Sequence, residues 1–350
     1  MFYIIVLLAS SMTSIKLELT KKLNDLAREG KLDGSVAILN LPGEFHCEKI
    51  EEIRQTPGGL WVQSCKDCVA EKEIPKRRLP SGKLNEIIDH FSANYGTKFI
   101  AIPGRGNPLH PKVREETLEK IRYASTKGLQ SYIFSASNGL TEDICRTLAE
   151  KGTNVMMSLR GNPFIDSAFF SGKQYPSSTG NKQNEARIAE RFRRLIKAYQ
   201  ESPNQPEPGT TRLAMNYVVT ETDLTDNGKK IKDLRQATSD NGILLVTNSE
   251  FDIYTNKRMS PETKERILSL TSPHSTTVNG QCRMGARSSL TIDSDGTVLP
   301  CPYFPNWRGY GNVLTPDGKL NIELLNRILP YNSGKACILR ESPVRLENKP

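Results

Sequence analysis

Short apolar runs alternate with segments in which apolar residues recur every three or four positions. Such runs are typical of buried strands, and such periodic segments are typical of helices that cover a sheet. The predicted strands are 35–41, 98–102, 131–135, 154–158, 213–219 and 243–246. The five predicted helices between them are 84–95, 113–127, 141–151, 185–200 and 229–239. This alternation predicts a parallel sheet with helices outside it.

Five or six repeats of strand and helix suit an α/β fold, specifically a partial (βα)6 TIM-like barrel. A polar segment at 13–32 predicts a helix before the first strand, and residues 48–55 predict a short helix after it. In barrels of this kind the chemistry collects at the carboxyl ends of the strands. The candidate residues at those ends are Gly104, Gly106, Asn107, Asn138, Ser158 and Arg160.

The pattern changes after residue 272. Segments 289–292 and 297–299 flank an Asp-Gly pair, which predicts a β-hairpin, and residues 320–329 predict a short helix. We therefore expect an N-terminal extension over 1–34, the barrel over 35–272 and a small C-terminal β-hairpin/α domain over 273–350.

Composition narrows the class of protein. The 350 residues carry a net charge of +9, but the basic residues are dispersed, so nucleic-acid binding is the less favoured interpretation. No apolar run approaches the roughly 20 residues of a membrane span. Residues 2–9 resemble the apolar core of a signal peptide without its basic start, and we predict a cytoplasmic protein with no membrane association.

Six of the seven cysteines fall into two groups. The first group is Cys47, Cys65 and Cys68, and the second is Cys282, Cys301 and Cys337. Paired thiols in a large enzyme-like chain suit metals better than disulfides. Three thiolates leave one iron of a [4Fe–4S] cube open to a small molecule. The seventh, Cys145, lies in a predicted helix and is expected to be a packed core thiol.

The order of these motifs resembles the radical S-adenosylmethionine (SAM) superfamily. The resemblance implies a cluster held by Cys47, Cys65 and Cys68 after the first strand. It also implies that the glycine-rich segment 104–108 contacts the SAM amino group, and that Asn138, Ser158 and Arg160 lie at later SAM-contacting strand ends.

Three departures from the family pattern stand out. The usual spacing is C-X3-C-X2-C, but Trp61 occupies the first position, and seventeen residues separate Cys47 from Cys65. Asn107 replaces the usual glutamate, so it brings an amide oxygen without a charge. Arg160 stands where aspartate is frequent and could pair with the SAM carboxylate or an anionic substrate.

The C-terminal domain resembles the SPASM/Twitch auxiliary-cluster domain. Thirteen residues separate Cys282 from Gly296 and four separate Gly296 from Cys301, which fits C-X9–15-G-X4-C. A Gly-Asn-Val segment at 311–313 follows, and one late thiol, Cys337, implies the shorter form with one auxiliary Fe–S cluster.

The resemblance implies an enzyme that reductively cleaves SAM to a 5′-deoxyadenosyl radical. It implies a reductant protein such as flavodoxin or ferredoxin, and a substrate that is a peptide or a small metabolite. The alternative from another class is a basic, zinc-binding, non-enzymatic nucleic-acid protein, because Cys65 and Cys68 could join Cys282 and Cys301 in a four-cysteine zinc site.

Overall fold

The computed structural model describes part of the chain. The described residues are 15–31, 35–43, 46, 52–55, 59–63, 72–75, 78–103, 106–159, 170, 182–219, 223–224, 228–249, 262, 277–278, 281–282, 289–299, 302 and 309–328. No helix within these ranges has the length and apolar character that crossing a membrane requires.

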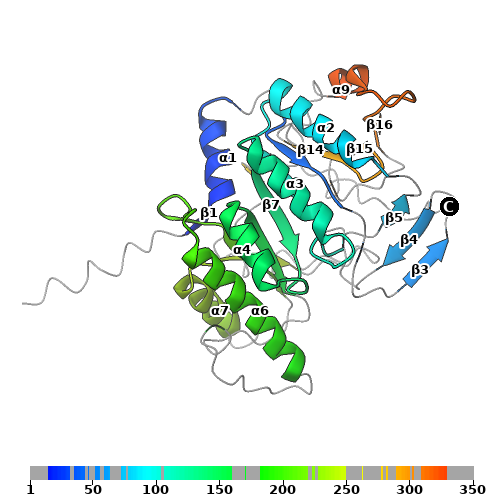
Figure 1. The fold of residues 1–350 in the computed structure, drawn as a ribbon. Helices are drawn as coiled ribbons and strands as arrows, with labels where there is room; N and C mark the ends of the chain where they lie inside the picture. The colour runs from blue at the N-terminus through cyan, green and yellow to red at the C-terminus, as the bar shows by residue number, and fades with distance from the viewer. Residues whose placement is uncertain are drawn as a thin grey trace, which may run out of the picture.

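A nine-stranded sheet forms the centre of the molecule (Figure 1). Six neighbouring strands are parallel: β2 (Ile38–Asn40), β6 (Phe99–Ile102), β7 (Gln130–Ser135), β8 (Asn154–Leu159), β10 (Leu213–Val219) and β11 (Leu244–Ser249). The helices that connect them are α2 (Ser81–Asn94), α3 (Arg114–Thr126), α4 (Glu142–Glu150), α6 (Lys182–Glu201) and α7 (Lys229–Asp240). The predicted partial (βα)6 arrangement is therefore confirmed, with spatial neighbours in sequence order.

The two faces of this sheet pack differently because successive side chains alternate across a strand. On β6, Ile100 and Ile102 join the clusters that contain the covering helices. Phe99 and Ala101 face the other way, into a separate cluster. That inner cluster also contains Ala37, Tyr132, Met156, Ala214, Leu244, Val246 and, from α1 (Glu18–Arg28), Leu19 and Leu23. The N-terminal helix, predicted over 13–32, thus packs against the inner face.

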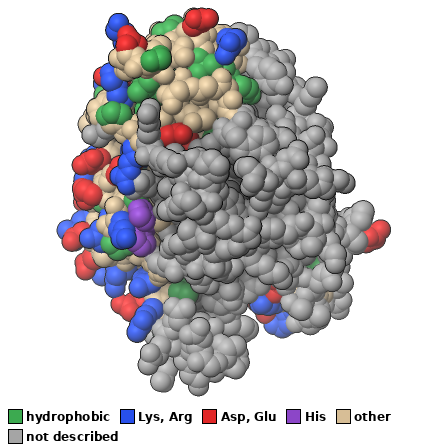
Figure 2. Space-filling view, turned by 90° about the vertical axis from the view of Figure 1, so that its right-hand side faces the viewer, with side chains coloured by type: hydrophobic (Ala, Val, Ile, Leu, Met, Phe, Trp, Pro, Cys, Tyr) green, Lys and Arg blue, Asp and Glu red, His purple; other side chains and the backbone are tan. Residues whose placement is uncertain are grey.

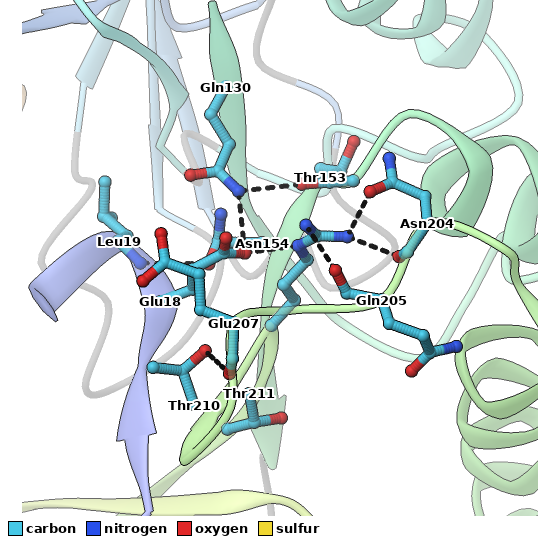
Figure 3. A network of polar contacts seen from close by, with 12 residues as sticks. Glu18, Leu19, Gln130, Thr153, Asn154, Asn204, Gln205, Glu207, Thr210 and Thr211 are labelled. Carbon is cyan, nitrogen blue, oxygen red and sulfur yellow. Dashed lines mark hydrogen bonds and ion pairs between the residues drawn. The ribbon is translucent and has the colours of Figure 1, made fainter. Parts of the chain in front are cut away.

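A buried polar network fixes α1 (Figure 3). The Glu18 side chain, 2% exposed, accepts a hydrogen bond from Arg212 Nε and another from Gln130 Nε2 at 3.0 Å. Arg212 also donates to Asn204 O at 2.6 Å. Beside this network, β1 (Lys16–Leu17) pairs with β9 (Thr210–Thr211). The ion pair and the strand pairing therefore join residues 16–18 to residues 210–212, which lie nearly two hundred positions later in the chain.

The predicted helix over 48–55 is wrong for residues 52–55. These residues form β3 (Glu52–Gln55), which pairs antiparallel with β4 (Gly59–Gln63), and β4 pairs with β5 (Lys72–Pro75). Cross-strand pairing here overrides the helix propensity of Glu, Arg and Gln. The long insert between Cys47 and Cys65 therefore contains a β-hairpin.

The predicted C-terminal hairpin is confirmed as β14 (Ser289–Ile292) and β15 (Thr297–Leu299), followed by β16 (Gly311–Asn312) and α9 (Ile322–Ile328). Its turn uses Gly296 at φ +88°. β14 lies parallel to β2, so this hairpin continues the barrel sheet. The boundary predicted at 272 lies outside the described residues, and the division into domains stays a prediction.

Candidate functional site

The carboxyl ends of the parallel strands meet at one edge of the sheet, and the loops that follow β2, β6 and β7 contact one another there. His46, which follows β2, forms a parallel bridge with Gly106, which follows β6. Asn107 N donates to His46 O at 2.7 Å. Because His46 directly precedes Cys47, the loop that carries the first predicted thiol begins at this edge.

Gly106 makes this approach possible. Its φ is +87°, and a Cβ at this position would stand less than 3 Å from three backbone atoms of His46. Any larger residue would clash with backbone that cannot move aside easily. The glycine predicted to contact SAM therefore has a demonstrated packing role, and its contact with SAM stays a prediction.

The side chain of Asn107 links the same loop to the end of β7. It is 3% exposed, and its Oδ1 accepts from Leu109 N at 3.1 Å and lies 3.1 Å from Ser135 Oγ. Its Nδ2 donates to Asn138 O at 2.8 Å. The amide oxygen, which we expected to accept from the SAM ammonium group, accepts these bonds within the protein. The structure thus assigns Asn107 a bracing role, and its contact with SAM stays a prediction.

Asn138 is held from its other side by α6. Arg191 Nη1 donates to Asn138 Oδ1, and Arg194 Nη1 donates to Leu140 O at 3.0 Å. Two arginines of α6 therefore bind the loop after β7. The next residue, Gly139, has a φ of +91°, and a Cβ there would overlap the Leu109 backbone.

Two histidines stack at this edge. The rings of His46 and His110 have centroids 5.4 Å apart and planes inclined by 15°. His110 N donates to Asn107 O at 2.9 Å, and His110 Nδ1 accepts from Lys112 N at 3.3 Å. Sequence reasoning missed His110. The signal that could have found it was that two of only four histidines follow adjacent strands of one parallel sheet.

Ser158 lies near the carboxyl end of β8 and pairs in register with Asn216 of β10. Since Met156 belongs to the inner cluster, Ser158, two residues later, faces the same inner side. The predicted position of Ser158 at the open end of the barrel interior is consistent with this arrangement. Its contact with SAM stays a prediction.

The cysteines divide into one described core thiol and the predicted ligands. Cys145 of α4 is fully buried, and burial raises the pKa of its thiol to about 12. Its predicted role as a packed core residue is confirmed. Cys282 belongs to β13 (Gln281–Cys282), which pairs with β12 (Thr277–Val278). Other predicted site residues lie outside the described residues: Cys47, Cys65, Cys68, Gly104, Arg160, Cys301 and Cys337. Within the described part, no three metal-binding side chains gather.

No protein-family model and no curated protein sequence matches the chain. A histidine-tagged form of anSMEcpe with bound AdoMet superposes with a TM-score of 0.50 and 16% identity, over 86% of this chain and 84% of that chain. Streptococcus suis SuiB bound to its precursor peptide SuiA gives 0.48 and 12%, over 81% of this chain and 63% of that chain. The chain thus spans less than two thirds of SuiB. The similarity to anSMEcpe, at the level of structure, shows that this chain shares the fold of that protein, a partial barrel of parallel strands covered by helices.

Proposed function

We propose that this protein is a radical SAM enzyme whose first cluster is held by Cys47, Cys65 and Cys68. The observation that carries the proposal is the bridge between His46 and Gly106. It starts the Cys47 loop at the carboxyl edge of the parallel sheet, where this fold places its chemistry. The thiols of Cys65 and Cys68 follow in the same connection between β2 and α2.

The thiols of the chain fit a [4Fe–4S] cluster with one open iron. Cluster irons take thiolate ligands, and three thiolates leave a coordination site for SAM. Cys145 is the thiol of the predicted barrel that lies outside the proposed set. It is buried in the core, and burial raises the pKa of its thiol to about 12, so the thiol keeps its proton. Cys47 is therefore the third thiol that the barrel offers beside Cys65 and Cys68.

A [4Fe–4S] cluster held by Cys47, Cys65 and Cys68 would supply the electron for reductive cleavage of SAM and so the oxidising power for removing hydrogen from a substrate. The protein's own residues position the reactants and exclude water. Asn107 and Gly106 hold the strand-end loops together, and Ser158 faces the inner side where SAM would lie. The apolar inner cluster, which α1 supplies with Leu19 and Leu23, fills the other end of the interior.

We further propose an auxiliary Fe–S cluster on Cys282, Cys301 and Cys337. Its support is the confirmed hairpin: Cys301 comes two residues after β15 ends, and Cys282 lies in the short strand β13 before the hairpin. A flavodoxin- or ferredoxin-like protein would supply electrons, and the substrate would be a peptide or a small metabolite. Thiolate-held clusters suit the reducing cytoplasm, where we place the enzyme.

Elemental analysis of anaerobically purified protein tests the proposal. We expect a brown protein with about eight irons, from two four-iron cubes, and little zinc. Colourless protein loaded with zinc would overturn the proposal and favour the zinc-binding nucleic-acid protein. The charge pattern does not favour that alternative: on the face shown in Figure 2, described Lys and Arg side chains lie among Asp and Glu side chains.

Replacing Cys282 by alanine is expected to lower the iron content by about half and to leave uncoupled SAM cleavage detectable, because each site holds its own cube. Iron content and 5′-deoxyadenosine formation measure the two effects. Cys145→Ala is the matched control, since it removes a thiol that is buried in the core and should keep all the iron. Loss of all iron in Cys282→Ala would show that the six cysteines serve one site.

A further inference from the structure

We propose that His110 is a positioning residue for the first cluster, because it holds in place the residue that precedes Cys47. This inference rests on the proposed function. The ring of His110 stacks on the ring of His46, with centroids 5.4 Å apart and an angle of 15° between the planes. Stacked pairs of this kind restrict both rings.

The need for such a residue follows from the length of the insert. Seventeen residues separate Cys47 from Cys65, and they contain β3 and β4. The chain between the two thiols is therefore too long to fix the position of Cys47 by itself. Contacts between the start of this loop and the rest of the barrel, together with the pairing of β3 and β4 within the loop, therefore reduce the length of free chain.

His46 makes those contacts through its backbone and its ring. Its carbonyl accepts from Asn107 N, and its backbone lies against Gly106. Its ring lies on His110, whose own N–H donates to Asn107 O at 2.9 Å. The loop after β6 therefore contacts both the backbone and the ring of His46, the residue before Cys47.

His110 is itself held firmly. Val113 N and Arg114 N both donate to His110 O at 2.9 Å, so His110 is tied to the first turn of α3. Lys112 N donates to His110 Nδ1 at 3.3 Å, which restricts rotation of the ring. His110 therefore presents a ring with a fixed orientation to His46. The stack requires an aromatic ring and does not require a charge.

Two variants and two readouts test the inference on the full-length chain. In His110→Ala, we expect the Asn107 amide to exchange hydrogen about threefold to tenfold faster in the metal-free protein, a range that corresponds to the loss of one stacked pair. In the iron-loaded protein, release of iron from the SAM-binding cluster to a ferrous chelator should accelerate by a similar factor. His110→Phe keeps a flat ring and should restore both rates to within about twofold of wild type.

His90→Ala is the matched control, because His90 is a half-buried histidine of α2 with edge contacts to Phe91 of the same helix and to Tyr95, the residue that follows the helix. It should leave both rates unchanged even if the melting temperature falls. Unchanged rates in His110→Ala, or a His110→Phe protein as impaired as His110→Ala, would overturn the inference. A wild-type chain that takes up no iron would instead overturn the proposed function, and the exchange rate of the Asn107 amide would still report on the stack.

Discussion

Replacing Cys47 by alanine is expected to abolish reductive cleavage of SAM, to the same extent as Cys65→Ala or Cys68→Ala. Each change removes one of three thiolates, and two are too few to hold a cube with one open iron. Formation of 5′-deoxyadenosine under reducing, anaerobic conditions measures the effect without a known substrate.

The structural reason to choose Cys47 is the anchoring of His46 at Gly106. A free loop of seventeen residues would cost about 1.5 kcal/mol more to close than the three-residue spacing of the family. Anchoring the start of the loop, and pairing β3 with β4 within it, shortens the part that remains to be closed. Cys145→Ala serves as the control. A Cys47→Ala protein that still cleaves SAM would show that the third ligand is another residue.

Most of the barrel could be predicted from the sequence because its signals are local. Every strand of the parallel series has a short apolar run, as in the Phe-Ile-Ala-Ile of β6. In each helix that connects two of these strands, apolar residues recur every three or four positions. The parallel sheet follows from the alternation alone. The hairpin at 289–299 was predictable for the same reason, since its Asp-Gly turn is a local signal.

The error at 52–55 has the opposite cause. The segment Glu-Ile-Arg-Gln contains good helix formers, but it is too short for its apolar pattern to distinguish a helix from a strand. Its structure therefore depends on whether another strand pairs with it. That partner is the Leu-Trp-Val-Gln segment of β4. A strand whose pairing decides its structure cannot be identified from its own residues.

The strand ends that carry the candidate residues were predictable from the sequence, but the contacts of their side chains were not. The strand ends were located correctly, because parallel strands bring their carboxyl ends to one edge. The roles of the side chains depend on neighbours far away in sequence: Asn107 is bound by the loop after β7, and His46 is covered by His110. The same holds for Arg191, which binds Asn138 across 53 residues. No local pattern specifies such pairs.

The second large effect is expected at the buried pair that fixes α1. Replacing Arg212 by alanine should lower the free energy of unfolding by about 3–5 kcal/mol, because it leaves the Glu18 carboxylate buried without its main partner. Arg122→Ala is the matched control. Arg122 pairs with Glu115 at 2.7 Å on the exposed face of α3, where such a pair contributes about 1 kcal/mol or less. Denaturant titration measures both, and the midpoint should move without a change in slope.

The pH dependence of stability gives an independent test of the same pair. Burial by itself raises the pKa of Glu18, but hydrogen bonds from Arg212 and Lys22 outweigh it and hold the pKa below its ordinary value of 4.5. The stability that ionised Glu18 contributes is therefore present above pH 4.5 and is lost as the pH falls through the lower pKa of the folded state. Wild-type protein should lose stability more steeply in this acidic range than Glu18→Gln. Equal slopes, or an Arg212→Ala protein as stable as Arg122→Ala, would mean that the inner cluster of apolar side chains holds α1 without the ion pair.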